Sequence, residues 1–226
     1  MRFNTLKQTN VFIVFCIFFL SCTNKQQTTF KLKEGDLLFQ NTGNGKIDNA
    51  IKNVTATNLA KNYSHVGIAT QEGKEWYIVE AIPKKGVCKT PLLDFLNRNK
   101  NEVDKSKTTV ARLDDYYIPY ISRAIAYGLE KINQPYDAVF LWNDDAYYCS
   151  ELVYKMFASQ PELPKEKIPF LTHLMTFKDN SGKTMSNWVT YYKKLKIPIP
   201  EGIKGTNPNL MASSAHIKFV HDYEKE

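Results

Sequence analysis

The stretch that most constrains this chain is a predicted helix with a cysteine at its start. Residues 147–157 read YYCSELVYKMF. Apolar side chains follow Cys149 at intervals of three, four and seven residues: Leu152, Val153 and Met156. That spacing puts the thiol on the same face as an apolar stripe that packs against the rest of the protein. Free N–H groups at a helix N-terminus favour a thiolate, so Cys149 is a candidate nucleophile. The alternative is a small buried residue of the core.

A second informative stretch, residues 63–81, has the pattern of a β-hairpin, with two β-rich runs on either side of Glu72-Gly73. If these two residues form the loop, His65 lies opposite Glu80 on the same face of the hairpin. A carboxylate beside an imidazole fixes one tautomer and makes the ring more basic, as a general base requires. The alternatives are a hydrogen-bonded sheet histidine and a surface charge. Glu80 interrupts an apolar run, however, where an unpaired carboxylate would be costly.

The first 30 residues predict export and attachment rather than a part of the fold. A basic start, an unbroken apolar run over residues 11–20 and a small residue before Cys22 are typical of a signal peptide. The apolar run is too short for a stable membrane span. The four residues that end at Cys22 resemble a bacterial lipoprotein box. We therefore expect removal of residues 1–21, lipidation of Cys22, and a polar tether over residues 22–30. The alternative is cleavage and release without a lipid.

Length and composition indicate one domain, which we place at residues 31–224. The chain has 226 residues, of which 43% are apolar and 23% charged, enough for a single core. Loss of the leader removes Arg2 and Lys7 but no acidic residue, so the net charge falls from +7 to +5. This charge is spread along the chain without an aromatic and basic platform. The sequence therefore predicts no nucleic-acid partner.

Cysteine and histidine spacing gives no metal motif. Cys88 and Cys149 are the cysteines of the expected domain, and in an oxidising compartment they could form a disulfide. That pairing is the main structural alternative to a free nucleophile. The histidines other than His65 are His173, His216 and His221. None of these has a metal-binding spacing to another His or Cys, so we predict no metal and no cofactor.

The rest of the chain predicts short strands and helices in alternation. Expected strands lie at 37–39, 108–113 and 215–223, and residues 171–177 are strand or loop. Expected helices lie at 47–54, at 91–96 with Thr90 as its cap, from Pro119 to about 132, and at 188–195. Residues 161–169 and 197–208 are rich in proline or glycine and predict loops or extended chain. This mixture is typical of the α+β class.

Five short motifs occur in an order that resembles a known family. They are GDLLF at 35–39, SHVGI at 64–68, VEA at 79–81, YD at 136–137 and YCSELV at 148–153. Together they resemble the circularly permuted papain-like amidases of the YaeF/YiiX group, within the NlpC/P60 superfamily, over roughly residues 32–220. The resemblance implies an α+β papain-like fold. In that fold a central antiparallel sheet carries the histidine and the acid, and the nucleophile helix packs against the sheet.

The resemblance also implies a role for individual residues. Cys149 would be the nucleophile, His65 the base and Glu80 the orienting acid, with the Cys149 backbone N–H among the oxyanion donors. Candidate substrate contacts are Tyr63, Tyr136 and Tyr148, and residues 204–214 would line the cleft. Cys88 has no counterpart in the family pattern, so we expect it to be structural and free.

We therefore expect an exported cysteine hydrolase, lipid-anchored at the bacterial cell envelope, which cleaves an amide bond in a peptide such as a peptidoglycan stem. Its expected partners are that peptide or acyl-amide substrate and the membrane, reached through the lipid. One alternative is an acyltransferase or lipid-ester hydrolase of the same fold. Another is a non-catalytic binding module of the envelope. The sequence leaves the oligomeric state open.

Overall fold

The fold was determined as a computed structural model that describes residues 30–42, 61–179 and 181–225. The expected leader, nearly all of the expected tether, and the helix predicted at 47–54 lie outside the described residues. Within the described ranges no helix has the length and apolar character needed to cross a bilayer.

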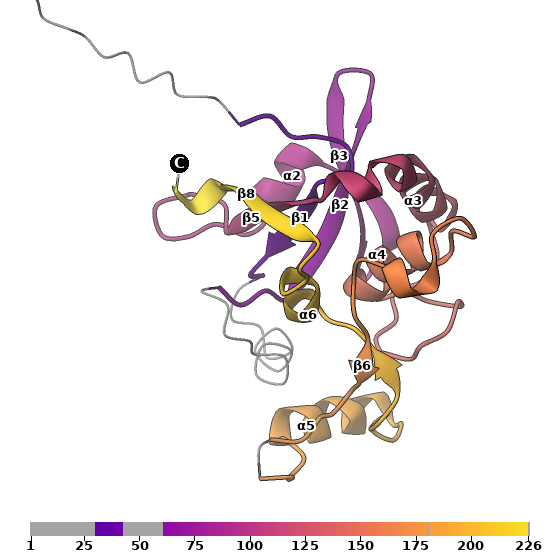
Figure 1. The fold of residues 1–226 in the computed structure, drawn as a ribbon. Coiled ribbons are helices and arrows are strands. Elements are labelled where there is room, and N and C mark those ends of the chain that lie inside the picture. Colours follow the sequence, from indigo (N-terminus) through magenta and orange to yellow (C-terminus); the bar gives the residue numbers. More distant parts are fainter. Residues whose placement is uncertain (1–29, 43–60, 180, 226) are drawn as a thin grey trace, which may run out of the picture. The chain divides into compact units, whose positions relative to one another are not determined.

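A six-stranded antiparallel sheet forms the centre of the domain (Figure 1). Its spatial order is β4 (Gly86–Pro91), β3 (Glu75–Ile82), β2 (His65–Glu72), β1 (Leu37–Gln40), β5 (Thr108–Leu113) and β8 (Ile217–Asp222). Every neighbouring pair is antiparallel. The predicted α+β class with a central antiparallel sheet is confirmed, as are the strands predicted at 37–39, 108–113 and 215–223.

Strand β1 is only four residues long but lies in the middle of the sheet, hydrogen-bonded to β2 on one side and to β5 on the other. All four of its residues are fully buried. Its run of Leu37, Leu38 and Phe39 is apolar without alternation because both faces of the strand are covered.

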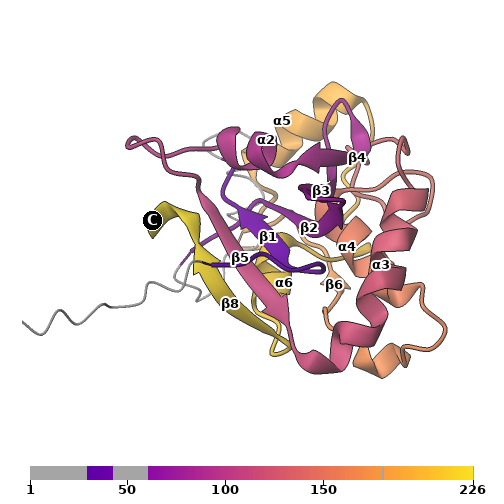
Figure 2. The same cartoon turned by 90° about the horizontal axis from the view of Figure 1, so that it is seen from above.

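Helices α3 (Ile118–Glu130) and α4 (Cys149–Ala158) pack against each other and against the sheet (Figure 2). The predicted apolar stripe of α4 is fully buried, and Leu152, Val153 and Met156 share one core with Val66 and Val79 of the central strands. A shorter helix, α2 (Leu92–Asn97), follows β4, and α6 (Pro208–Ala212) precedes β8. Three-residue 3₁₀ turns are η1 (Asp115–Tyr117), η2 (Lys165–Lys167) and η3 (Tyr223–Lys225).

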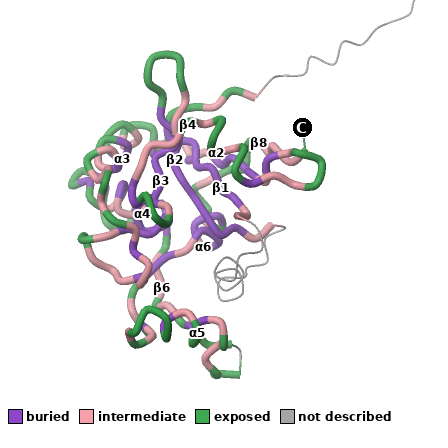
Figure 3. Tube along the Cα trace, turned by 180° about the vertical axis from the view of Figure 1, so that it is seen from behind, coloured by how far each residue is buried: buried purple, intermediate pink, exposed green. Residues whose placement is uncertain are grey.

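A second, aromatic core lies beyond the sheet. A two-stranded ribbon, β6 (His173–Leu174) with β7 (Lys204–Gly205), leads to α5 (Ser186–Leu195). The cluster consists of Phe140, Tyr148, Phe177, Trp188 and Tyr192. Figure 3 shows the buried residues gathered in the sheet, whereas the tip of the β2–β3 hairpin and most of α5 are exposed or half-buried.

Two local predictions are wrong. Thr90 does not cap α2, because it is still part of β4 and Pro91 occupies the N-cap position without a side-chain hydrogen bond. Helix α3 ends at Glu130, two residues earlier than predicted, and Asn133 follows with a φ of +74°. The strand-or-loop segment 171–177 contains only the two-residue strand β6.

Candidate active site

The hairpin of β2 and β3 brings His65 and Glu80 together, in a register two residues from the predicted one. Thr70 pairs with Tyr77 and Glu72 with Glu75, so the loop is Gly73-Lys74 rather than Glu72-Gly73. Gly73 has a φ of +59°, which suits glycine at the first loop position of a type II′ turn. A shift of two residues keeps every side chain on its predicted face, because strand side chains alternate with a period of two.

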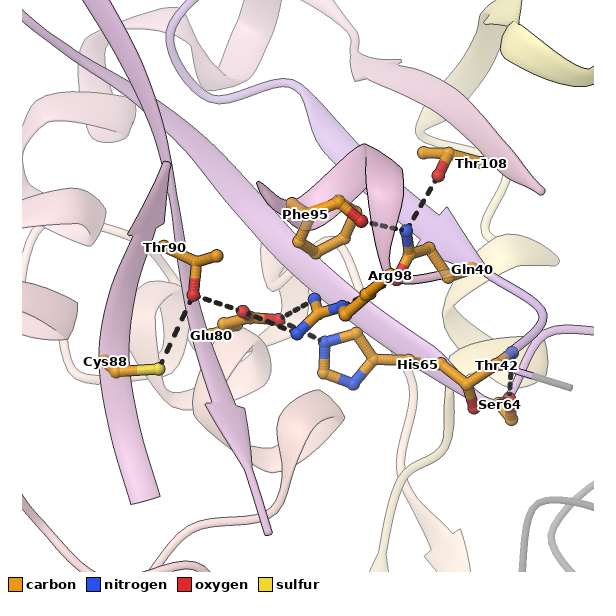
Figure 4. Close-up of polar contacts among 10 residues, drawn as sticks. All are labelled: Gln40, Thr42, Ser64, His65, Glu80, Cys88, Thr90, Phe95, Arg98 and Thr108. Carbon is orange, nitrogen blue, oxygen red and sulfur yellow. Dashed lines mark hydrogen bonds and ion pairs between the residues drawn. The ribbon is translucent and has the colours of Figure 1, made fainter. Parts of the chain in front are cut away.

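The His65 ring bonds directly to the Glu80 carboxylate: Nε2 lies 2.6 Å from Oε2 (Figure 4). Both side chains are buried, Glu80 completely. Gly67 lies on β2, two residues after His65. A Cβ there would come within 2.4 Å of the Ile78 side chain and 3.2 Å of the Glu80 Cβ. The missing side chain at Gly67 therefore leaves room for the histidine and the acid to meet.

Glu80 has two further partners, Thr90 and Arg98. The Thr90 hydroxyl donates to Oε1 at 2.6 Å. Arg98 donates from Nη1 to Oε1 at 3.0 Å and from Nη2 to Oε2, so its planar guanidinium grips both oxygens (Figure 4). Burial raises the pKa of Glu80, but the hydrogen bonds and charges of His65 and Arg98 outweigh burial and lower it to about 2. Glu80 is therefore a carboxylate at any pH near neutral.

Cys149 is the first residue of α4, as predicted, and its backbone N–H lies where an α-helix offers no internal acceptor. The side chain is 6% exposed and lines a hollow. Cys88 and Cys149 are both free thiols, so the disulfide alternative is wrong. Contacts from residues 204–208 fix the start of α4: the Thr206 N–H donates to the Tyr148 hydroxyl at 3.2 Å, and Ser150 Oγ donates to the Thr206 carbonyl at 3.3 Å.

His65 interacts with both Glu80 and Cys149, and the two interactions set its charge. Burial lowers the pKa of His65, but hydrogen bonding to Cys149 and Glu80, together with their negative charges, raises it to about 9. Because Nε2 faces Glu80, Nδ1 is the ring nitrogen left for the thiol. The imidazole can therefore take a proton from the thiol while the carboxylate holds the ring through its other nitrogen.

The hollow beside Cys149 is narrow, with a cavity volume of about 60 Å³. Its lining is mostly aromatic and apolar and comes from the second core: Tyr136, Phe140, Tyr148, Met175, Phe177 and Trp188. Polar groups come from Ser64, Ser150, His173, Thr176, Thr206 and Asn207. An apolar group bound in this hollow would therefore lie close to the thiol.

The predicted contact residues divide between two places. Tyr136 and Tyr148 line the hollow, as do residues 206–208 of the predicted segment 204–214. Tyr63 does not: its ring packs between Phe39 and Phe219 and lines a different cavity, next to Lys61. What Tyr63 does contribute is its backbone N–H, which donates to the buried Asn209 Oδ1 at 2.6 Å just before His65.

Sequence reasoning missed Arg98 and Glu151, and it missed the roles of Thr90 and Asn209. Glu151 is buried in the first turn of α4, where its Oε2 accepts from the Tyr148 N–H at 3.4 Å and its other oxygen lies 2.9 Å from Lys155 Nζ. Burial raises its pKa, Lys155 opposes the rise, and the result is about 7. The sequence carried only half of the capping-box signal, the acid at the third helical position, because the N-cap residue is Tyr148 rather than Ser or Thr.

No group of three or more His, Cys, Asp and Glu side chains is arranged to hold a metal ion in the described part of the chain. Both oxygens of Glu80 are already engaged by a cation, Arg98. Each of these oxygens also accepts a further hydrogen bond, Oε2 from His65 and Oε1 from Thr90, so neither is left to ligate a metal. The residues around Cys149 therefore do not fit a metal, and no step below depends on one.

Comparison with known proteins gives one family. The family model described as "permuted papain-like amidase enzyme, YaeF/YiiX, C92 family" matches residues 31–221. The uncharacterized protein YiiX of Escherichia coli strain K12 is 31% identical over 124 residues, which are 54% of this chain and 56% of YiiX, so the match spans just over half of that relative. The crystal structure of "metalloprotein yiiX" from Escherichia coli O157:H7 superimposes with a TM-score of 0.67 at 22% identity, over 85% of this chain and 98% of that one.

Proposed function

Since this chain belongs to the family of permuted papain-like amidases that includes YaeF and YiiX, we propose that it is a cysteine amidase with Cys149 as its nucleophile. The observation that carries the proposal is the placement of His65, which interacts with Cys149 on one side and bonds Glu80 on the other. A buried carboxylate, an imidazole and a thiol at a helix N-terminus are the parts that covalent acyl transfer needs.

In the proposed reaction the Cys149 thiol gives its proton to His65, and the sulfur attacks the carbonyl carbon of an amide. The Cys149 N–H is placed to stabilise the oxyanion that forms. The C–N bond then breaks as His65 gives the proton to the leaving amine, which leaves a thioester on Cys149. Water, deprotonated by His65, attacks the thioester and releases a carboxylic acid and the free thiol. Glu80 stays ionised throughout and holds the His65 ring in position.

The proposed setting is the cell envelope. Residues 1–21 act as a signal peptide, and a lipid on Cys22 holds the domain at the membrane through residues 22–30. The proposed substrate is an amide of the envelope, such as a peptidoglycan stem peptide. The structurally similar protein from Escherichia coli O157:H7 is described as a metalloprotein. We propose no metal for this chain, because the donors described above do not fit one.

A second candidate, acyl-ester hydrolysis or acyl transfer, is favoured by one observation. The hollow beside Cys149 is lined mostly by aromatic and apolar groups, among them Phe140, Phe177 and Trp188. Such a lining suits a lipid acyl chain at least as well as a peptide. The same thioester would form in either case, and only the leaving group and acceptor would differ.

The test is a substrate panel with a matched control variant. The mature protein is assayed on muropeptides and on acyl esters, next to Cys149→Ala and Cys88→Ala. Both cysteines are free thiols. Burial raises the pKa of Cys88, and its hydrogen bond to Thr90 offsets only part of that rise, so Cys88 serves as the unreactive control. We expect amide hydrolysis that persists in Cys88→Ala and disappears in Cys149→Ala. Ester turnover alone would favour the second candidate. No turnover of either substrate, with ligand binding unchanged in Cys149→Ala, would leave a binding module.

A further inference from the structure

Glu80 is a buried carboxylate that forms a two-point ion pair with the Arg98 guanidinium. It is fully inaccessible to solvent, and each of its oxygens has a contact to Arg98. Oε2 also meets His65, and Oε1 also meets the Thr90 hydroxyl. A lone buried carboxylate beside an imidazole would pull a proton onto the ring whatever the state of the thiol. A carboxylate paired with a guanidinium still accepts a hydrogen bond, but the pair has no net charge.

We propose that Arg98 is a positioning residue of this site: it offsets part of the charge of Glu80 while Oε2 still accepts from His65, so that the charge of His65 follows mainly the state of Cys149. This inference rests on the proposed function for its meaning, because it assigns His65 the proton of the nucleophile. It predicts that His65 is less basic with Arg98 in place than it would be beside Glu80 alone. Glu80 orients the His65 ring, and Arg98 limits how strongly the charge of Glu80 acts on that ring.

The structure fixes Arg98 more firmly than a surface ion pair requires. Its Nε donates to Gln40 Oε1 at 3.2 Å, and its guanidinium carbon lies 4.4 Å from the centre of the Phe95 ring. Gln40 is fully buried on β1, and its amide donates to the Phe95 carbonyl at 2.8 Å and to the Thr108 hydroxyl at 2.9 Å (Figure 4). The planar fork is thus held by α2, β1 and β5 together. A lysine at this position could supply the charge but not the two parallel bonds.

The ionisable groups around His65 are few. Glu80 on β3 and Cys149 on α4 act on it directly. Arg98, at the end of α2, acts through Glu80. Cys88 on β4 lies beyond Thr90, with its sulfur 3.7 Å from the Thr90 hydroxyl, and burial keeps it a neutral thiol near pH 7. Any change in the charge of His65 on removal of Arg98 therefore reports on Glu80.

The experiment titrates His65 by NMR in a Cys149→Ser background, where no thiolate contributes. In Arg98→Met the charge of Glu80 is unmasked, and we expect the pKa of His65 to rise by about one unit. In Glu80→Gln the charge of Arg98 is unmasked instead, and the pKa should fall by about one unit. In Glu80→Gln/Arg98→Met both charges are gone, and the pKa should return close to that of the parent.

Arg112 provides a matched control. It grips the fully buried Asp36 as Arg98 grips Glu80, with contacts of 2.7 Å from Nε and 2.8 Å from Nη2, but it lies on β5. Arg112→Met removes an equivalent ion pair from the same sheet, and we expect the titration of His65 to be unchanged. The two arginine variants should lose similar thermal stability, so a general loosening of the sheet would affect both alike.

The outcomes separate this inference from the proposed function. An unchanged or lower pKa of His65 in folded Arg98→Met, or an equal rise in Arg112→Met, would overturn the role of Arg98. If Arg98→Met does not fold, the fall in Glu80→Gln and its reversal in the double variant decide the question in the same way. The titration needs no substrate. Failure of the wild-type protein to hydrolyse amides would therefore refute the proposed function without affecting this measurement.

Discussion

His65 and Glu80 meet as a diagonal pair across the β2–β3 hairpin: their side chains bond at 2.6 Å, although the register places Glu80 two residues from the position opposite His65. Diagonal neighbours on one face are within reach of long side chains. The diagonal contact depends on Gly67, which has no side chain to fill the space in front of Glu80. A predicted register that is wrong by two residues therefore still puts the two side chains on one face, whereas one that is wrong by a single residue would put them on opposite faces.

Replacement of the acid is expected to be milder than replacement of the base. His65→Ala removes the proposed general base, and kcat/KM should fall by about a thousandfold or more. Glu80→Gln leaves an amide oxygen that can still accept from Nε2, so kcat/KM should fall by about ten- to a hundredfold. Steady-state kinetics on the substrate identified by the panel make the comparison. Equal losses in the two variants would show that Glu80 does more than orient the ring.

The pH dependence should have a basic limit near 9. His65 must be protonated to release the amine, and its interactions with Cys149 and Glu80 raise its pKa from 6.5 to about 9. The stability that these interactions add is therefore fully present below pH 6.5 and is lost as the pH rises through 9. We expect kcat/KM to fall above about pH 9, and the decline of Tm to start at lower pH in Cys149→Ala, where no thiolate supports the imidazolium. A basic limit near 6.5 would contradict this assignment.

Glu151 should make the protein less stable as the pH rises through neutrality. Burial raises its pKa from 4.5 to about 7, so its contribution to stability is fully present below pH 4.5 and is lost as the pH rises through 7. Glu151→Gln keeps an acceptor for the Tyr148 N–H and removes the charge, while Lys155 keeps Asp144 as a partner at 2.8 Å. We expect a Tm at pH 8 that is higher than that of the wild type by about 5 °C.

The control for this change is Glu162→Gln, since Glu162 is half-exposed and pairs with Arg123 at the surface. It should leave the pH dependence of Tm near and above neutrality unaltered, because Arg123 lowers the pKa of Glu162 below its ordinary value of 4.5. Thermal unfolding between pH 4 and 9 records both variants. A Glu151→Gln protein that is less stable than the wild type at pH 8 would mean that the ionised pair with Lys155 stabilises the helix start.

Attachment to the membrane is tested at Cys22. If this residue is lipidated, the protein made with its own leader should fractionate with membranes, and its N-terminal peptide should carry the mass of a lipid. Cys22→Ser should abolish that mass and leave the precursor uncut. Cys16→Ser changes the other cysteine of the leader and should alter neither result. A Cys22→Ser protein that is processed and released normally would favour plain cleavage.

The parts of the site that were predictable are those fixed by local pattern. The α4 helix and its thiol followed from an apolar stripe of helical spacing, and the hairpin followed from two β-rich runs around a glycine. The turn itself was missed because a single glycine fits either loop position, and only its φ of +59° selects the first. A predicted register that is wrong by two residues still places every side chain on its correct face of the strand, so the pairing of His65 with Glu80 was still found.

Arg98 could not be predicted, because nothing in its local sequence marks it as a partner of Glu80. The two residues meet only because α2 returns over the sheet after β4, and the guanidinium reaches back across the strands. Asn209 was missed for the same reason: it supports the start of β2 from α6, 146 residues later in the chain. Contacts between distant segments depend on tertiary packing, for which a single sequence carries no periodic signal.

The position of β1 has a mechanical consequence. Any tether on the N-terminal side enters the domain at the middle of the sheet, where Leu37–Gln40 is held from both sides and Asp36 is pinned by Arg112. A force applied along the tether therefore acts in shear on two rows of hydrogen bonds at once, those from β1 to β2 and those from β1 to β5. A strand at the edge of the sheet would separate one hydrogen bond at a time, so entry at β1 makes the domain more resistant to a pull from its N-terminal side than entry at an edge strand would.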